Sequence, residues 1–138
     1  MISDIDEEFL KACISDYYQN VLLALANGAD VNVAWDDDGN TGLIISSIYC
    51  NFNNVDWLLK CKKLEKEKTN SLGETALMVA AENKDWSIAN RLIEAKCNVN
   101  HRNLKNETAL GKINKLKKQY ERYQNPVEEL LIDAGATE

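Results

Sequence analysis

Apolar residues along the chain gather in short segments that are separated by polar, turn-forming stretches. Residues 76–81 form one apolar segment, rich in small side chains, and a polar break separates it from a second one at residues 88–95. The apolar positions of the second segment have the spacing of one helical face: Ile88, Leu92, Ile93 and Ala95. This pattern predicts two short antiparallel helices joined by a turn.

The same pair of segments recurs along the chain. The peptide ETAL occurs twice and the similar NTGL once, and their threonines, Thr41, Thr75 and Thr108, are 34 and 33 residues apart. A second marker, an apolar segment that begins at Val55, returns at Ile88 and at position 127. Fixed periods of this length are typical of stacked supersecondary units, so we expect one elongated repeat domain.

The repeated unit resembles the ankyrin repeat, whose pattern opens with G-x-T-P-L-H-x-A-A and closes with G-A-D-V-N. The matching residues are Gly73, Thr75, Leu77, Ala80 and Ala81, and at the close of the first unit Gly28, Ala29, Asp30, Val31 and Asn32. The resemblance covers essentially the whole chain. It implies an all-α solenoid of four helix-turn-helix units, at residues 4–38, 39–72, 73–105 and 106–138, joined by extended or hairpin-like loops.

Three structural expectations follow from this register. Each repeated threonine should cap the start of a first helix. One ladder of large side chains should run through the core, formed by Phe9, Leu43, Leu77 and Leu110. The last unit carries six extra residues, which predicts a lengthened first helix with Ile113, Leu116, Tyr120 and Tyr123 on one face. Every unit lacks the Pro and His of the Thr-Pro-Leu-His pattern, and that His normally ties neighbouring loops together.

Composition narrows the class of protein further. The net charge is −6, which disfavours general nucleic-acid binding. Residues 1–60 hold ten acids and two bases, whereas residues 61–138 hold twelve acids and fourteen bases. The acidic start is unlike a signal peptide and no apolar run is long enough to cross a membrane, so we expect a cytoplasmic protein. The expected oligomeric state is a monomer. We also expect reduced, buried, structural thiols at Cys13, Cys50, Cys61 and Cys97.

No reaction centre is visible in the sequence. We expect the single histidine, His101, and the nearby Asn103 to be exposed loop residues, and no nucleophile has a placed partner. The triplet Asp36, Asp37 and Asp38 is interpreted as a solvated loop tip. We therefore expect no enzyme, cofactor, metal or small-molecule substrate. The alternative is a small metal-dependent enzyme or regulator that uses His101, Cys97 or the aspartates.

By resemblance, the protein is expected to be a non-catalytic protein-protein interaction module that binds through its loop tips and the concave face of its first helices. The residues implied are Trp35, Asp36, Asp38 and Asn40; Thr69, Ser71, Leu72 and Glu74; Arg102, Leu104, Lys105 and Glu107; and, on the helices, Tyr49 and Glu82.

The partner's identity stays open, although a basic patch on it would suit the three aspartates. For Trp35 two interpretations stay open, a partner contact or a ring that lies back over the first unit. The competing function is binding of an anionic surface, nucleic acid or membrane, through the basic segment from Lys112 to Arg122.

Overall fold

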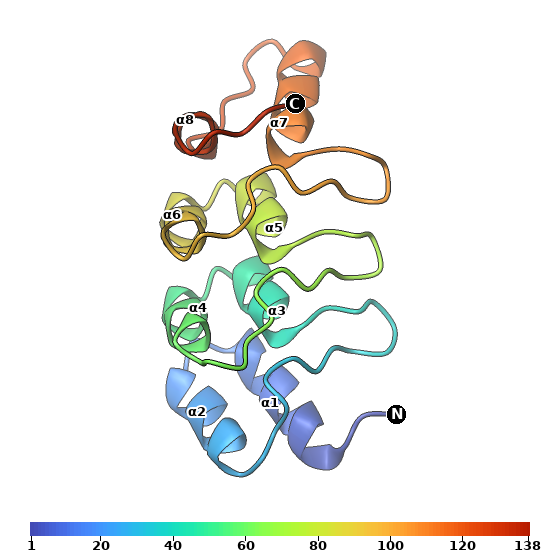
Figure 1. Ribbon diagram of the computed structural model, residues 1–138, viewed down its shortest axis with the longest axis vertical. Coiled ribbons are helices and arrows are strands. Elements are labelled where there is room, and N and C mark those ends of the chain that lie inside the picture. The colour runs from blue at the N-terminus through green and yellow to red at the C-terminus, as the bar shows by residue number, and fades with distance from the viewer.

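The computed structural model describes residues 1–138 and contains eight helices in four antiparallel pairs, stacked in chain order (Figure 1). The first helices of the pairs are α1 (Asp4–Ile14), α3 (Gly42–Ile48), α5 (Ala76–Glu82) and α7 (Ala109–Gln119). The second helices are α2 (Tyr18–Ala26), α4 (Phe52–Leu59), α6 (Trp86–Glu94) and α8 (Val127–Asp133). First helices pack on first helices and second on second, which confirms the predicted all-α solenoid.

The repeated threonines begin the first helices as predicted. The Oγ1 atoms of Thr41, Thr75 and Thr108 accept hydrogen bonds from backbone N–H groups three residues on, at 3.3, 3.3 and 3.0 Å. Each bond satisfies one of the amide groups that the first turn of a helix leaves without a partner. The repeated peptide is thus the entrance to α3, α5 and α7.

The predicted ladder contributes three of its four residues, Phe9, Leu43 and Leu77, to the continuous hydrophobic core, and Leu110 is buried outside it. Phe9, Leu43, Leu77 and Leu110 are all buried and lie on successive first helices. Small residues allow these helices to approach closely: a Cβ added to Gly42 would lie 2.6 Å from the ring of Phe9. Because each pair buries its apolar face against its neighbours, the core is continuous through the stack.

The lengthened first helix of the last pair is confirmed only in part. Helix α7 has 11 residues, against 7 in α5, and ends at Gln119. Tyr120 has an extended backbone (φ −126°, ψ 110°) and is exposed, so it does not continue the helical face. The remaining extra residues form a connection, residues 120–126, that replaces the three-residue turn of the other pairs.

The cysteines differ in environment. Cys13 and Cys97 are buried, and burial raises the pKa of each thiol to about 12. Cys50 is exposed in the α3–α4 turn, where its φ is +57°, and Cys61 is half-buried, so the expectation of four buried cysteines is wrong at these two positions. None of the helices combines the length and the apolar character needed to span a membrane.

Candidate functional site

The three long loops that follow α2, α4 and α6 stand in a row along one edge of the stack (Figure 1). Backbone hydrogen bonds join each loop tip to the next: Ser71 N–H donates to the carbonyl of Asp38 at 2.9 Å, and Leu104 N–H to the carbonyl of Leu72 at 3.1 Å. Gly73 has a φ of +73°, and a Cβ there would lie 2.8 Å from the Leu104 nitrogen. Glycine is therefore required for this close approach.

Asparagine side chains brace the tips from inside. The Oδ1 atom of Asn70 accepts from the N–H groups of Leu72 and Glu74, at 3.0 and 3.1 Å. Asn103 does the same for Lys105 and Glu107, at 3.0 and 2.9 Å. Asn103 is thus buried, at 8% exposure, and the expectation that it is an exposed loop residue is wrong. A short amide side chain that bonds its own backbone two residues on is typical of tight turns.

The histidine of the Thr-Pro-Leu-His pattern is absent, and other hydrogen bonds join neighbouring loops in its place. Asn32 accepts from the N–H of Glu65 at 2.7 Å and donates to the carbonyl of Lys63 at 2.8 Å. The Nε2 atom of His101 lies 2.9 Å from the carbonyl oxygen of Gly73. His101 is half-buried by this contact, which corrects its placement as an exposed residue.

A groove of about 460 Å³ lies beside the second and third tips, against α5 and α7. Six of the predicted partner residues line it: Leu72, Glu74, Glu82, Leu104, Lys105 and Glu107. Helix α7 adds Lys112, Lys115, Leu116 and Gln119. The sequence analysis missed these four as part of the groove, because only the stacking of α7 on α5 brings them to the loop tips.

At the base of the groove, one lysine forms ion pairs with two glutamates. Lys112 Nζ lies 3.1 Å from both carboxylate oxygens of Glu74 and 3.3 Å from Glu82. Burial alone would lower the pKa of Lys112, but the hydrogen bonds and charges of the two glutamates outweigh it and raise the pKa. Glu74 is buried and engaged, so in this structure it is not the accessible tip contact that was expected.

The rim of the groove is apolar and open. Leu72 and Leu104 are 60% and 78% exposed. Glu107 is engaged below them: a hydrogen bond from Asn103 and the charge of Lys115 outweigh burial and lower the pKa of its carboxyl group. Lys105 is exposed and has no ion-pair partner. The groove therefore offers two leucines and one cation to a partner.

The predicted residues of the first tip divide into two groups. Trp35 is half-buried and packs against the core, so the structure favours the interpretation in which its ring lies back over the first unit. Asp36 and Asp38 are exposed, although Asp38 Oδ1 also accepts from the N–H of Asn40 at 2.8 Å. Asn40 Oδ1 in turn accepts from the side chain of Asn70 at 3.0 Å.

The other predicted residues lie outside the groove. Thr69 is half-buried, and the exposed Ser71 donates its hydroxyl hydrogen to the carbonyl of Asp38 at 2.8 Å. Arg102 donates to the carbonyl of Asn106 at 2.9 Å. Tyr49, 53% exposed, caps the end of α3 that lies away from the loop tips.

The basic segment from Lys112 to Arg122 does not form a continuous cationic face. Lys112 and Lys115 are paired as described, at 3.1 and 3.6 Å, and Lys117 Nζ lies 2.7 Å from Glu128. Only Lys118 and Arg122 lack an ion pair. No group of three or more His, Cys, Asp or Glu side chains is arranged to hold a metal ion, and the aspartate triplet is no exception.

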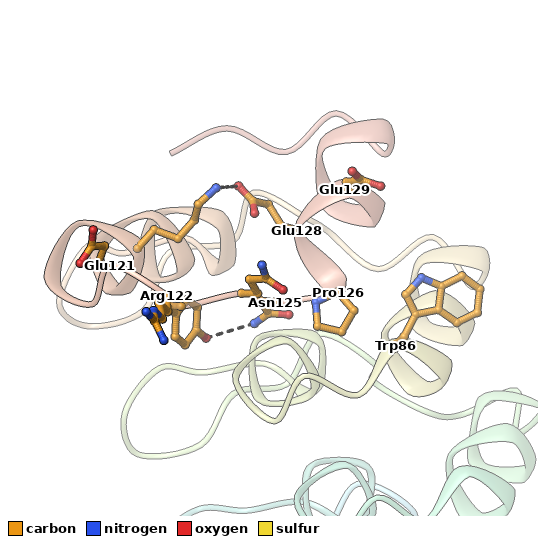
Figure 2. Close-up of a pocket in the computed structure, with 10 residues that line it drawn as sticks. Trp86, Glu121, Arg122, Asn125, Pro126, Glu128 and Glu129 are labelled. Carbon is orange, nitrogen blue, oxygen red and sulfur yellow. Dashed lines mark hydrogen bonds and ion pairs between the residues drawn. The ribbon is translucent and has the colours of Figure 1, made fainter.

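A second cavity, of about 680 Å³, opens at the other end of the helices (Figure 2). It lies between α6, the connection at residues 120–126 and the start of α8, and Trp86 forms part of its wall. The sequence analysis missed this cavity. An available signal was the ring at one position of three units, Tyr18, Phe52 and Trp86, each 34 residues from the next.

Comparison with known families returns one finding for this arrangement. A family model of ankyrin repeats, in three copies, matches residues 9–103. Comparison with curated proteins returns no match. Ankyrin repeats generally mediate protein-protein interaction and are typically non-enzymatic.

Proposed function

The chain belongs to the ankyrin repeat family, and from that premise we propose that it is a non-catalytic module that binds a partner protein through its loop tips and the groove between α5 and α7. The observation that carries this proposal is the pair of exposed leucines, Leu72 and Leu104, on a rim that backbone hydrogen bonds hold in place. A preorganised rim loses little conformational freedom on binding, which favours affinity.

The chemistry of the groove suggests the partner's complement. An apolar side chain would lie between Leu72, Leu104 and Leu116, and an acidic group would meet the unpaired ammonium group of Lys105. At the first tip, a basic patch would face Asp36, Asp37 and Asp38. Buried apolar contacts supply most of the affinity of such interfaces, whereas rim charges mainly steer association.

The test compares two leucines of equal exposure. Leu72→Asp should remove the partner from an affinity purification out of the native cell, because a carboxylate would replace the apolar rim. Leu23→Asp is the matched control, because Leu23 is exposed to the same degree as Leu72 but lies on α2, away from the groove. Partner proteins are identified by quantitative mass spectrometry, and melting temperatures confirm that both variants fold. Retention of the same partner by both variants, or loss from both, would contradict the proposed site.

A second test addresses the acidic tip. Because Asp38 braces the backbone at Asn40, the variant to use is Asp36→Lys with Asp37→Lys, which leaves that bond intact. Once the partner is known, the double variant should slow association roughly tenfold at low salt and by much less at high salt. An unchanged association rate at low salt would remove the tip from the interface.

A further inference from the structure

A row of ring-bearing residues runs along the edge of the stack opposite the loop tips. Tyr18, Phe52 and Trp86 are the first residues of α2, α4 and α6, and Pro126 immediately precedes α8. Phe52 and Trp86 are 39% and 50% exposed. Since these second helices pack on one another in order, their starts form a continuous line, here called the turn edge.

The second cavity lies on the turn edge, where Trp86 and Pro126 line it. Its labelled residues separate into two ends in Figure 2: Trp86 and Glu129 lie toward one end, Glu121 and Arg122 toward the other, with Pro126 between them. The long α7–α8 connection, residues 120–126, supplies six of the ten residues that line the cavity. The indole of Trp86 is left half-exposed on its wall.

Charge at the cavity favours a cationic ligand at the Trp86 end. Of the basic groups nearby, Lys117 pairs with Glu128 at 2.7 Å, Lys84 Nζ lies 4.5 Å from the centre of the Tyr123 ring, and the unpaired Arg122 lies toward the other end of the cavity. Glu129 is exposed and has no ion-pair partner. An aromatic face and an unpaired carboxylate on the wall of one cavity suit an arginine or lysine, through a cation–π contact and a charged hydrogen bond.

We propose that the turn edge binds an extended basic segment of a partner protein, with an arginine or lysine lying on Trp86 and directed at Glu129. The spacing of the rings supports an extended segment. Packed helices are about 8–10 Å apart, and a polyproline II segment rises about 9 Å in the three residues of one turn. Every third residue of such a segment therefore meets the next ring of the row. This site shares no lining residue with the groove of the proposed function and is independent of it.

The probe is a short fluorescein-labelled peptide in which every third residue is arginine and the others are proline. Binding is measured by fluorescence anisotropy and located by the indole N–H signals of ¹⁵N-labelled protein. The chain has three tryptophans, and Trp86→Phe identifies the signal of Trp86. The peptide should shift the Trp86 signal and leave that of Trp35 in place. A peptide with glutamate in place of arginine should not bind.

Variants of the protein complete the test. Trp86→Ala should weaken binding about tenfold, as truncation of a hot-spot aromatic does. Glu129→Gln should weaken it about threefold at low salt, the size expected of an exposed charge pair. Leu104→Asp should leave peptide binding unchanged, which separates this site from the groove. Absence of binding, equal binding of the glutamate peptide, or arginine-peptide binding that neither Trp86→Ala nor Glu129→Gln weakens would overturn the proposal.

Discussion

The loop-tip edge and the turn edge terminate the same helices but use their side chains in opposite ways. At the loop tips, the polar side chains of Asn70 and Asn103 bond their own backbone. At the turn edge, rings such as Trp86 have half of their surface in solvent. Polar side chains at these loop tips therefore brace the loops themselves.

The difference has a physical cause in the length of the connections. A long loop exposes many backbone N–H and C=O groups, and side chains must satisfy those that neighbouring loops bury. A three-residue turn has few such groups. In the α5–α6 turn, Lys84 takes a positive φ of +58° and Asp85 accepts from the N–H of Ile88 at 3.0 Å. Trp86 is then left without a bracing role.

The largest expected effect comes from the core that both edges share. Leu77→Ala should lower the free energy of unfolding by roughly 2–5 kcal/mol, because Leu77 is 1% exposed and its removal leaves a cavity. Urea denaturation measures the change. The control is Leu72→Ala, the same truncation at an exposed position, which should cost less than about 0.5 kcal/mol. Equal losses would show that the proposed core register is wrong.

The next effect separates the braces of the loop tips from their surface. Asn103→Ala should cost about 1–3 kcal/mol, because the N–H groups of Lys105 and Glu107 lose their acceptor. Lys105→Ala, in the same tip, should change stability by no more than about 0.5 kcal/mol. Thermal unfolding measures the stability of the two variants. If Lys105→Ala were the more damaging, the tip would be held by charge rather than by the asparagine.

A smaller effect is expected on the turn edge. Trp86→Ala should cost less than about 1 kcal/mol, although it removes the largest side chain of the row, because half of the ring is already in solvent. The same unfolding measurement applies. A loss as large as that of Leu77→Ala would show that Trp86 is part of the core, and would contradict the difference described between the two edges.

The smallest effect is kinetic and concerns the thiols. In the folded protein iodoacetamide should alkylate Cys50 first, because it is exposed, while Cys13 and Cys97 are buried. Burial and the nearby Asp85 raise the pKa of Cys50, so its thiolate fraction and reaction rate should keep increasing above the ordinary thiol pKa of about 8.5. Mass spectrometry of digested samples identifies the site. Equal labelling of all four thiols would indicate global opening.

Much of the fold was determined by the sequence alone. The period of 33 and 34 residues, the threonine caps and the buried ladder through Phe9 and Leu77 are properties of local spacing, because each unit repeats one solution to burying an apolar face. The six-residue insertion was also visible in the spacing. Where α7 would stop was not, because Tyr120 and Tyr123 match a helical face that the backbone leaves at Gln119.

Tertiary structure alone decided which tip residues are available to a partner. Glu74 and Leu72 are near neighbours in one tip, yet the first is buried against Lys112, 38 residues away, and the second is open to solvent. The same holds for the turn edge, where Trp86 and Glu129 line one cavity only because α6 packs on α8. Local periodicity specifies what each unit is. Exposure and charge pairing depend on contacts between units, which no single unit's sequence contains.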